Sequence, residues 1–143
     1  MIIVDADACP DIPYIIELAH RYNIAIKLIS DITHDINYEY ASVVTLSKDN
    51  QNVDMYIINN LKSEDILITQ DIALAAIALK ITNNVINTKG MIYSNDNIDE
   101  LLFIRHLNQI NRFIKKSTKH KKRTKEDTKN LLNSLENIIK KMV

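Results

Sequence analysis

The chain has 143 residues with 18 basic and 18 acidic side chains, so its formal net charge is zero. It contains one glycine and one cysteine, which excludes Walker and dinucleotide-binding loops, an internal disulfide and a multi-cysteine zinc cluster. The sequence has no apolar run long enough to span a membrane and no basic leader at its start. We therefore expect a cytoplasmic protein without a membrane partner.

The two signs of charge are distributed unevenly along the chain. Residues 1–104 hold 15 acids and 6 bases, whereas residues 105–143 hold 3 acids and 12 bases. The hydrophobic fraction of 46% is sufficient for a sizeable core, and the length fits one domain. We expect a single domain over 1–143, made of an acidic α/β body (1–104) and a basic helical C-terminal segment (105–143).

Short apolar runs alternate with helical patterns along the first hundred residues. Strands are predicted at 2–4, 24–29, 43–46, 66–68 and 85–86. Amphipathic helices are predicted at 12–19, 53–61, 72–79 and 97–114, and a last one runs from Thr124 to about residue 139. This order is typical of a three-layer α/β fold, with a central, mainly parallel sheet of about five strands and helices on both faces.

Four aspartates stand near the predicted strand ends. Asp5 and Asp7 follow the first strand, Asp71 follows the fourth, and Asp54 opens the helix after the third. If the first and fourth strands are neighbours, these side chains converge where such sheets bind ligands. Clustered carboxylates repel one another unless a cation offsets them, and their oxygens suit Mg²⁺ or Mn²⁺. The alternative for each aspartate is an ordinary helix cap.

Cys9 stands next to Pro10 at a predicted helix start. A helix N-terminus can lower the pKa of a thiol and make it reactive. The alternative, which we favour because no histidine is placed nearby, is a small buried residue that packs the helix against the sheet.

The basic charge of the C-terminal segment is concentrated in one stretch. Its candidate nucleic-acid-binding residues are Arg105, Arg112, Lys115, Lys116, Lys119, Lys121, Lys122 and Arg123. Such a patch is typical of contact with a phosphate backbone, and the alternative is a solvated loop. The last helix carries an apolar face from Leu131 to Ile139, which packs either on the core or on a second chain, so an oligomer is possible through it.

Several motifs together resemble one family. Asp5-Ala6-Asp7-Ala8-Cys9-Pro10, after a hydrophobic strand, resembles the signature of the YaiI/YqxD family of bacterial proteins. The segment 65–75 resembles its second motif, and Lys121-Lys122-Arg123-Thr124 its basic C-terminal motif. That family is similar to PIN-like domains, an α/β fold that often holds a metal-dependent ribonuclease site. The resemblance thus implies Asp5, Asp54 and Asp71 as metal ligands.

The leading hypothesis is a PIN-like hydrolase that cleaves phosphodiester bonds of RNA with Mg²⁺ or Mn²⁺. Asp5, Asp54 and Asp71 would bind the metal, and Asp7 would complete the site. Thr69 would position water or a ligand oxygen, and the basic segment would hold the nucleic-acid backbone.

Two alternatives remain open from the residues alone. The first is a non-catalytic module that binds nucleic acid or another partner and carries a vestigial acidic site. The second is a phosphatase of the haloacid-dehalogenase type. In this chain an apolar strand is followed by Asp5-x-Asp7, which resembles the first motif of those enzymes. In that enzyme Asp5 would be the nucleophile, Asp7 the acid–base and Ser30 a phosphate ligand.

Overall fold

The computed structural model describes residues 1–31, 38–46, 52–114 and 122–142, and its centre is a five-stranded sheet. The strands are β1 (Ile2–Asp5), β2 (Ile26–Ser30), β3 (Ser42–Thr45), β4 (Ile66–Ile68) and β5 (Val85–Ile86). Every pairing between them is parallel, and their spatial order is β3-β2-β1-β4-β5. The predicted sheet is therefore confirmed, with strand ends that shift by one or two residues.

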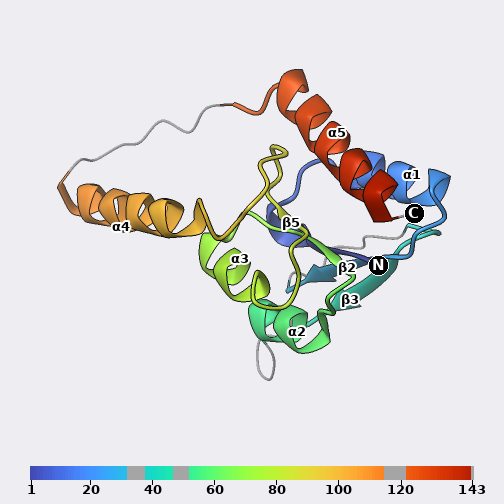
Figure 1. Ribbon diagram of the computed structural model, residues 1–143, viewed down its shortest axis with the longest axis horizontal. Coiled ribbons are helices and arrows are strands. Elements are labelled where there is room, and N and C mark those ends of the chain that lie inside the picture. Colours follow the sequence, from blue (N-terminus) through green and yellow to red (C-terminus); the bar gives the residue numbers. More distant parts are fainter. Residues whose placement is uncertain (32–37, 47–51, 115–121, 143) are drawn as a thin grey trace.

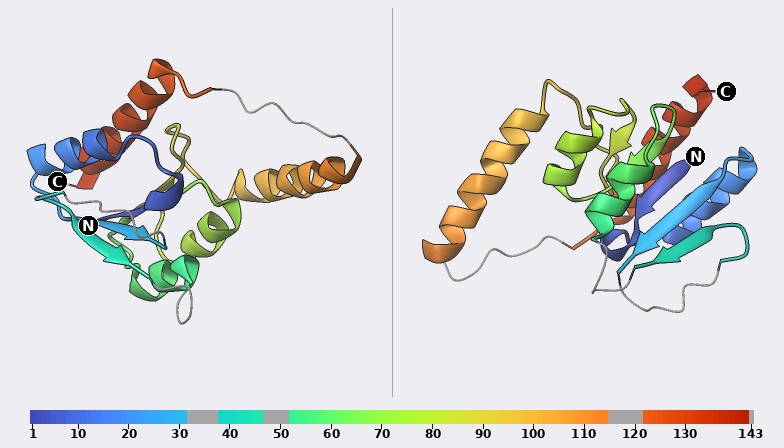
Figure 2. Two further views of the ribbon diagram at one scale, coloured as in Figure 1. Left: turned by 180° about the vertical axis from the view of Figure 1, so that it is seen from behind. Right: turned by 90° about the horizontal axis from the view of Figure 1, so that it is seen from below.

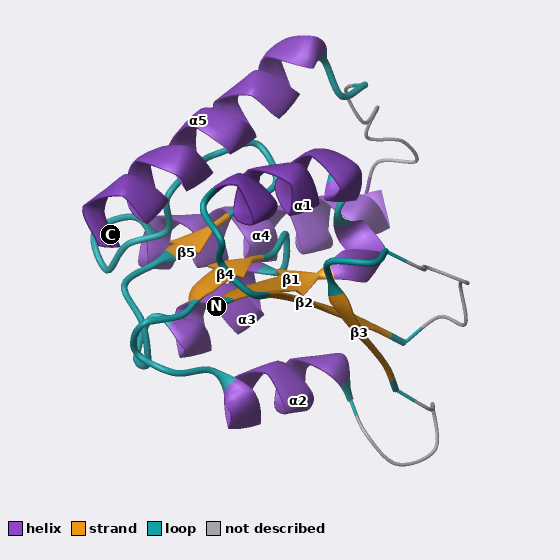
Figure 3. Ribbon diagram, turned by 90° about the vertical axis from the view of Figure 1, so that its right-hand side faces the viewer, coloured by secondary structure: helices purple, strands orange, loops and turns teal. Residues whose placement is uncertain are grey.

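Helices cover both faces of this sheet, as predicted (Figure 3). A short 3₁₀ turn, η1 (Ala6–Ala8), follows β1. The α-helices are α1 (Ile12–Arg21), α2 (Val53–Asn60), α3 (Ile72–Ala78), α4 (Ile98–Ile114) and α5 (Lys125–Met142). α1 and α5 lie on one face, and α2, α3 and the first turn of α4 lie on the other, which gives three layers.

β1, β4 and β5 are apolar on both faces because both faces of the sheet are covered there. In β1, Ile2 and Val4 pack into the cluster with α1 and α5, whereas Ile3 packs into the cluster with α2 and α3. All three side chains are buried. This two-sided burial explains why these three strands are continuous apolar runs in the sequence and do not alternate with polar residues.

The topology places a switch point beside β1. The chain runs outward from β1 to β2 and β3, then returns to form β4 and β5 on the other side of β1. Because crossovers between parallel strands are right-handed, this reversal puts α1 on the opposite face from α2 and α3. The carboxyl ends of β1 and β4 flank the switch, which is where such sheets form ligand sites.

The apolar face of α5 is part of the core of its own chain. Leu131, Leu135 and Ile139 are fully buried and lie in one cluster with β1 and α1. Thr124 caps this helix, as its Oγ1 accepts the amide of Asp127 at 3.1 Å and Asp127 accepts the amide of Thr124 at 3.0 Å. An oligomer formed through this helix stays a prediction, although the apolar face on which it rested is used within the chain.

The single glycine allows the loop after β5 to approach α5. Gly90 has a φ of +88°, and a Cβ added there would lie 2.4 Å from the carbonyl oxygen of Asn130. Ser134 of α5 donates a hydrogen bond of 2.7 Å to the carbonyl of Gly90. Both the backbone conformation and the space thus require glycine.

α4 extends away from the sheet (Figures 1 and 2). Its first turn packs against α3 through Ile98 and Leu101. From Phe103, which is 61% exposed, through residue 111 the side chains are solvent-exposed. Among the described residues, none of the helices has the length and apolar character needed to cross a membrane.

Candidate acidic site at the carboxyl edge of the sheet

The pairing of β1 with β4 brings Asp5 together with the residues that follow β4. Val4 is in register with Ile68, so Asp5 and Thr69 leave the sheet side by side. The hydroxyl of Thr69 donates to Asp5 Oδ2 at 2.9 Å and accepts the amide of Asp71 at 3.0 Å. The hydroxyl of Thr69, which is buried, thus links the carboxylate of Asp5 to the backbone amide of Asp71.

The charges of three other carboxylates contribute to the raised pKa of Asp5. Its pKa is raised from 3.8 to about 6, first by burial, against which the Thr69 hydrogen bond lowers it, and then by the charges of Asp54, Asp7 and Asp71. Burial also raises the pKa of Asp54, and Asp71 raises it further through its charge and a side-chain hydrogen bond. The structure therefore gathers the four predicted aspartates into one electrostatic group, which we call the acidic edge.

Capping accounts for only part of this group. Asp71 is the cap of α3, because its Oδ1 accepts the amides of Ala73 and Leu74 at 3.0 and 3.2 Å. Asp54, in contrast, lies in the first turn of α2, whose cap is Asn52. Asp5 ends a strand, and its side chain makes no cap for the turn that follows. The capping alternative therefore fits Asp71 and does not explain Asp54 or Asp5.

Asp7 joins η1 to the end of β2. Its Oδ1 accepts the hydroxyl of Ser30 at 2.5 Å, and its Oδ2 accepts the amide of Asp31 at 3.0 Å. Both carboxylate oxygens thus hold the β1 and β2 ends together. Ser30, the phosphate ligand of the phosphatase alternative, is buried in this contact.

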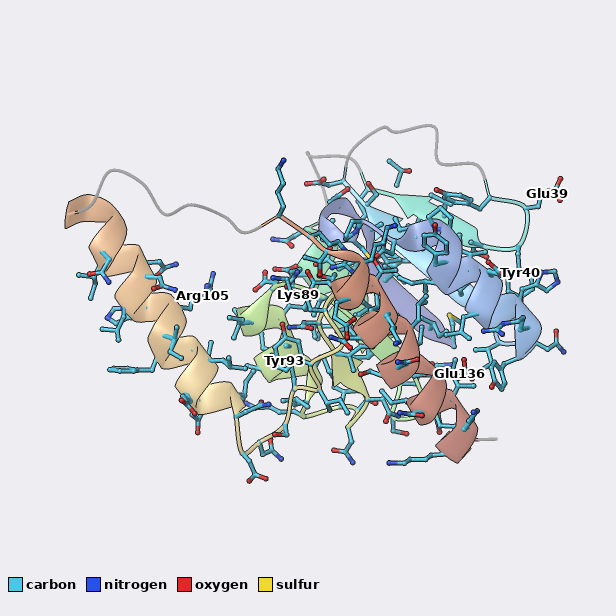
Figure 4. All side chains as sticks on the ribbon, turned by 90° about the horizontal axis from the view of Figure 1, so that it is seen from above. Glu39, Tyr40, Lys89, Tyr93, Arg105 and Glu136 are labelled. Atoms are coloured by element: carbon cyan, nitrogen blue, oxygen red, sulfur yellow. The ribbon has the colours of Figure 1, made fainter. Side chains whose placement is uncertain are left out.

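Tyr93 is a buried neighbour of the acidic edge that the sequence pattern did not identify as a site residue. Its hydroxyl donates to the carbonyl oxygen of Thr69 at 3.2 Å. Burial, and then the charge of Asp71, raises the pKa of Tyr93 to about 12. The tyrosine thus supports the backbone that carries Thr69 from the α4 side of the sheet, where Figure 4 labels it. A lone aromatic residue near a turn gave no signal of this role.

The acidic edge fits a divalent cation by donor type and charge. Mg²⁺ and Mn²⁺ prefer carboxylate oxygens, and a cation would offset the repulsion that Asp5 experiences. Within the described residues, no three histidine, cysteine, aspartate or glutamate side chains come close enough together to hold a metal ion. Coordination by three aspartates would thus require their side chains to draw together around the ion.

Cys9 is buried close to the acidic edge. Its pKa is raised to about 11, mainly by burial, with smaller contributions of both signs from Asp11, Arg123 and Asp5. The thiol is therefore protonated at neutral pH, which supports the packing role and not a reactive thiolate.

Arg123 connects the basic C-terminal segment to the first motif. Its Nε donates to Asp11 Oδ2 at 2.8 Å, its Nη2 contacts the same oxygen, and Nη2 also donates to the carbonyl of Thr88 at 2.6 Å. Thr128 Oγ1 donates to Asp11 Oδ2 at 2.8 Å. Asp11 thus anchors the start of α5 beside the start of α1, a role that no local pattern in the sequence indicated.

The remaining predicted basic residues are spread out or not described. Lys122 is exposed just before Arg123. Arg105, labelled in Figure 4, lies on α4, and it lines a groove together with Ile72 of α3. Arg112 is in the last turn of α4, with its side chain outside the described part. Four predicted lysines also lie outside the described residues, namely Lys115, Lys116, Lys119 and Lys121.

Comparison with known proteins identifies relatives over nearly the whole chain. A family model described as "Uncharacterized BCR, YaiI/YqxD family" matches residues 3–141. A UPF0178 protein of Clostridium perfringens is 43% identical over 142 residues, which cover 99% of this chain and 95% of the relative. A relative with the same name in Alkaliphilus oremlandii is 42% identical over 88% of this chain and 82% of its own length. Another, in Natranaerobius thermophilus, is 38% identical over 99% of this chain and 97% of its own length. No solved structure matches the chain.

Proposed function

Because the chain belongs to the YaiI/YqxD family, whose description assigns no activity, we propose a function from the acidic edge itself: hydrolysis of phosphodiester bonds in RNA, assisted by Mg²⁺ or Mn²⁺. The observation that carries the proposal is the electrostatic state of Asp5. It is a partly buried carboxyl at the switch point of a parallel sheet, and burial, followed by the charges of three other aspartates, raises its pKa. Such groups cluster at functional sites.

The proposed roles follow from the contacts of each residue. Asp5, Asp54 and Asp71 would hold the cation, which when bound supplies positive charge against the phosphate and lowers the pKa of water. Thr69 would keep Asp5 oriented through its 2.9 Å hydrogen bond. Asp7 would fix the ends of β1 and β2 through Ser30. In this scheme Thr69 and Asp7 are positioning residues.

The position of the basic residues at the start of α5 supports the proposal of a nucleic-acid substrate. Arg123 is held at Asp11, and Cys9 experiences the charges of both Arg123 and Asp5. Arg123, at the described end of the basic segment, is therefore close to the acidic edge. Lys122 and Lys125 flank Arg123 and are exposed, so they would be the cations available to offset the charge of a phosphate backbone.

The direct test is cleavage of a mixed pool of RNA by the wild-type protein in Mn²⁺, compared with the Asp5→Asn variant. We expect cleavage that needs the metal and is lost in Asp5→Asn. Glu17→Gln, which removes an exposed carboxylate on α1, is the matched control and should cleave normally. Cleavage that survives Asp5→Asn, or that proceeds in EDTA, would contradict the proposal.

One observation favours a second candidate, the non-catalytic nucleic-acid-binding module. Within the described part of the chain, no three potential ligands converge on an ion site. In that case RNA binding would be sensitive to salt, independent of metal and unchanged in Asp5→Asn. The same two proteins distinguish the candidates when binding in EDTA is compared with cleavage in Mn²⁺, because binding without cleavage supports the module.

A further inference from the structure

A pocket of about 430 Å³ opens between the start of α1 and the start of α5. Its volume is within the range of small-molecule sites in proteins. The residues that line it are Asp11, Tyr14, Arg123, Thr124, Lys125 and Thr128. Asp11 follows β1 and η1 along the chain, and Arg123 also contacts the carbonyl of Thr88 after β5. The pocket therefore lies at the same carboxyl edge as the aspartates, on the face covered by α1 and α5.

The lining combines an exposed aromatic ring with positive charge. Tyr14 is 55% exposed, although it lies on a helix whose other large apolar side chains are buried. Lys125 is exposed at the first position of α5. The one carboxylate in the lining, Asp11, is engaged by Arg123 and Thr128. Two cations and one paired carboxylate leave the pocket with an excess of positive charge.

We propose that this pocket binds one nucleotide of a single-stranded RNA, with the base stacked on Tyr14 and a phosphate contacted by Lys125. An exposed aromatic ring beside a flexible cation is the combination by which proteins bind unpaired nucleotides with little sequence preference. The inference rests on the proposed function for its substrate class. It adds the residues that would hold the strand beside the acidic edge.

Arg123 has a different part in this pocket. Its guanidinium is already bound to Asp11 and to the Thr88 carbonyl, so it shapes the wall and holds α5 in place. Replacing it would disturb the docking of α5 as well as the pocket. The test therefore uses Tyr14 and Lys125, whose exposed side chains can be changed without removing a buried contact.

The first experiment measures binding of a fluorescein-labelled single-stranded RNA octanucleotide by anisotropy in EDTA, so that cleavage does not contribute. Loss of stacking on one base corresponds to a drop in affinity of between about 5-fold and 150-fold, which we expect for Tyr14→Ala. Tyr14→Phe keeps the ring and should bind like the wild type. Phe103→Ala removes a similarly exposed aromatic residue on α4 and should have no effect.

The second experiment measures the salt dependence of the same binding. Loss of one phosphate contact to single-stranded RNA reduces the slope of log K against log salt by about 0.7, which we expect for Lys125→Gln. Lys141→Gln, at the other end of α5, is the control and should keep the full slope. Circular dichroism of each variant checks that its fold is retained.

The outcomes separate this inference from the proposed function. Affinity of Tyr14→Ala within about twofold of the wild type, an equal loss in Phe103→Ala, or no RNA binding by the wild type would overturn the pocket, whether or not the protein cleaves RNA. Binding that depends on Tyr14 without any cleavage in Mn²⁺ would support the pocket and overturn the nuclease.

Discussion

Asp5→Asn should stabilise the metal-free protein, and the gain should depend on pH. In the folded state the pKa of Asp5 is raised to about 6, first by burial and then by the charges of its neighbours. Below about pH 3.8 the carboxyl is protonated in both the folded and the unfolded chain. Between that pH and about 6 the folded chain keeps a proton that the unfolded chain has lost, so stability falls as pH rises. Above pH 6 the whole penalty is present.

The magnitude follows from the displacement of the pKa. A rise from 3.8 to about 6 corresponds to about 3 kcal/mol of unfolding free energy at neutral pH. The asparagine carbonyl can still accept the Thr69 hydroxyl, but as a weaker, uncharged acceptor. We therefore expect Asp5→Asn to stabilise the protein by about 1–3 kcal/mol at about pH 8 and by close to nothing at about pH 4.

The assay is urea unfolding in EDTA, followed by far-ultraviolet circular dichroism, at both pH values. Glu17→Gln on the exposed side of α1 removes the same charge and should give a difference near zero at both. A variant that is equally stabilised at both pH values, or destabilised at pH 8, would refute the argument that Asp5 is held in a repulsive site.

Three further predictions test the surroundings of the site. Mn²⁺ at about one hundred times its dissociation constant should raise the unfolding free energy of the wild type by about 2.7 kcal/mol and that of Asp5→Asn by much less, measured as a thermal shift. Thr69→Val removes a buried hydroxyl that serves two partners and should cost about 1–3 kcal/mol in urea unfolding, whereas Thr69→Ser should recover most of it. Gly90→Ala places a methyl group 2.4 Å from the carbonyl oxygen of Asn130 and should lower the unfolding free energy, measured in urea, by about 2 kcal/mol or more. Asn23→Ala, at a residue with a φ of 55°, is the control and should lower it by about 1 kcal/mol or less. Equal losses in the two variants would contradict the contact of Gly90 with α5.

Hydrophobic pattern was sufficient to predict the elements and the layers. Short apolar runs such as Ile66–Ile68 lie in strands that are covered on both faces, and such runs are typical of parallel sheets. The order of the strands was not predictable from pattern. The order depends on which strand pairs with β1 on each side. The convergence of the aspartates was therefore predicted only on the condition that β1 and β4 are neighbours. Once that pairing is known, the convergence of Asp5 and Asp71 follows from geometry.

Long-range polar contacts account for what the sequence did not predict. Arg123 belongs to a run of basic residues, and composition alone does not distinguish an inward-facing arginine from exposed lysines. Its partner Asp11 is 112 positions away, and nothing local marks either residue. Thr69 was expected to position water or a ligand oxygen, which stays a prediction, and the hydrogen bonds of its hydroxyl to Asp5 and Asp71 were not predicted. In each case a partner from a distant segment determines the role.

The packing of α5 on β1 and α1 has a consequence for synthesis and folding. Glu136 on α5, labelled in Figure 4, pairs with Arg21 on α1 across 115 positions, so the contact order of this layer is high and we expect folding to be slow. During translation α1 is available early to cover part of this face, but the part that α5 covers stays exposed until Leu131, Leu135 and Ile139 have been added, after all five strands. The nascent chain thus holds apolar strand surface that only α5 covers, and it depends on this helix to leave that aggregation-prone state.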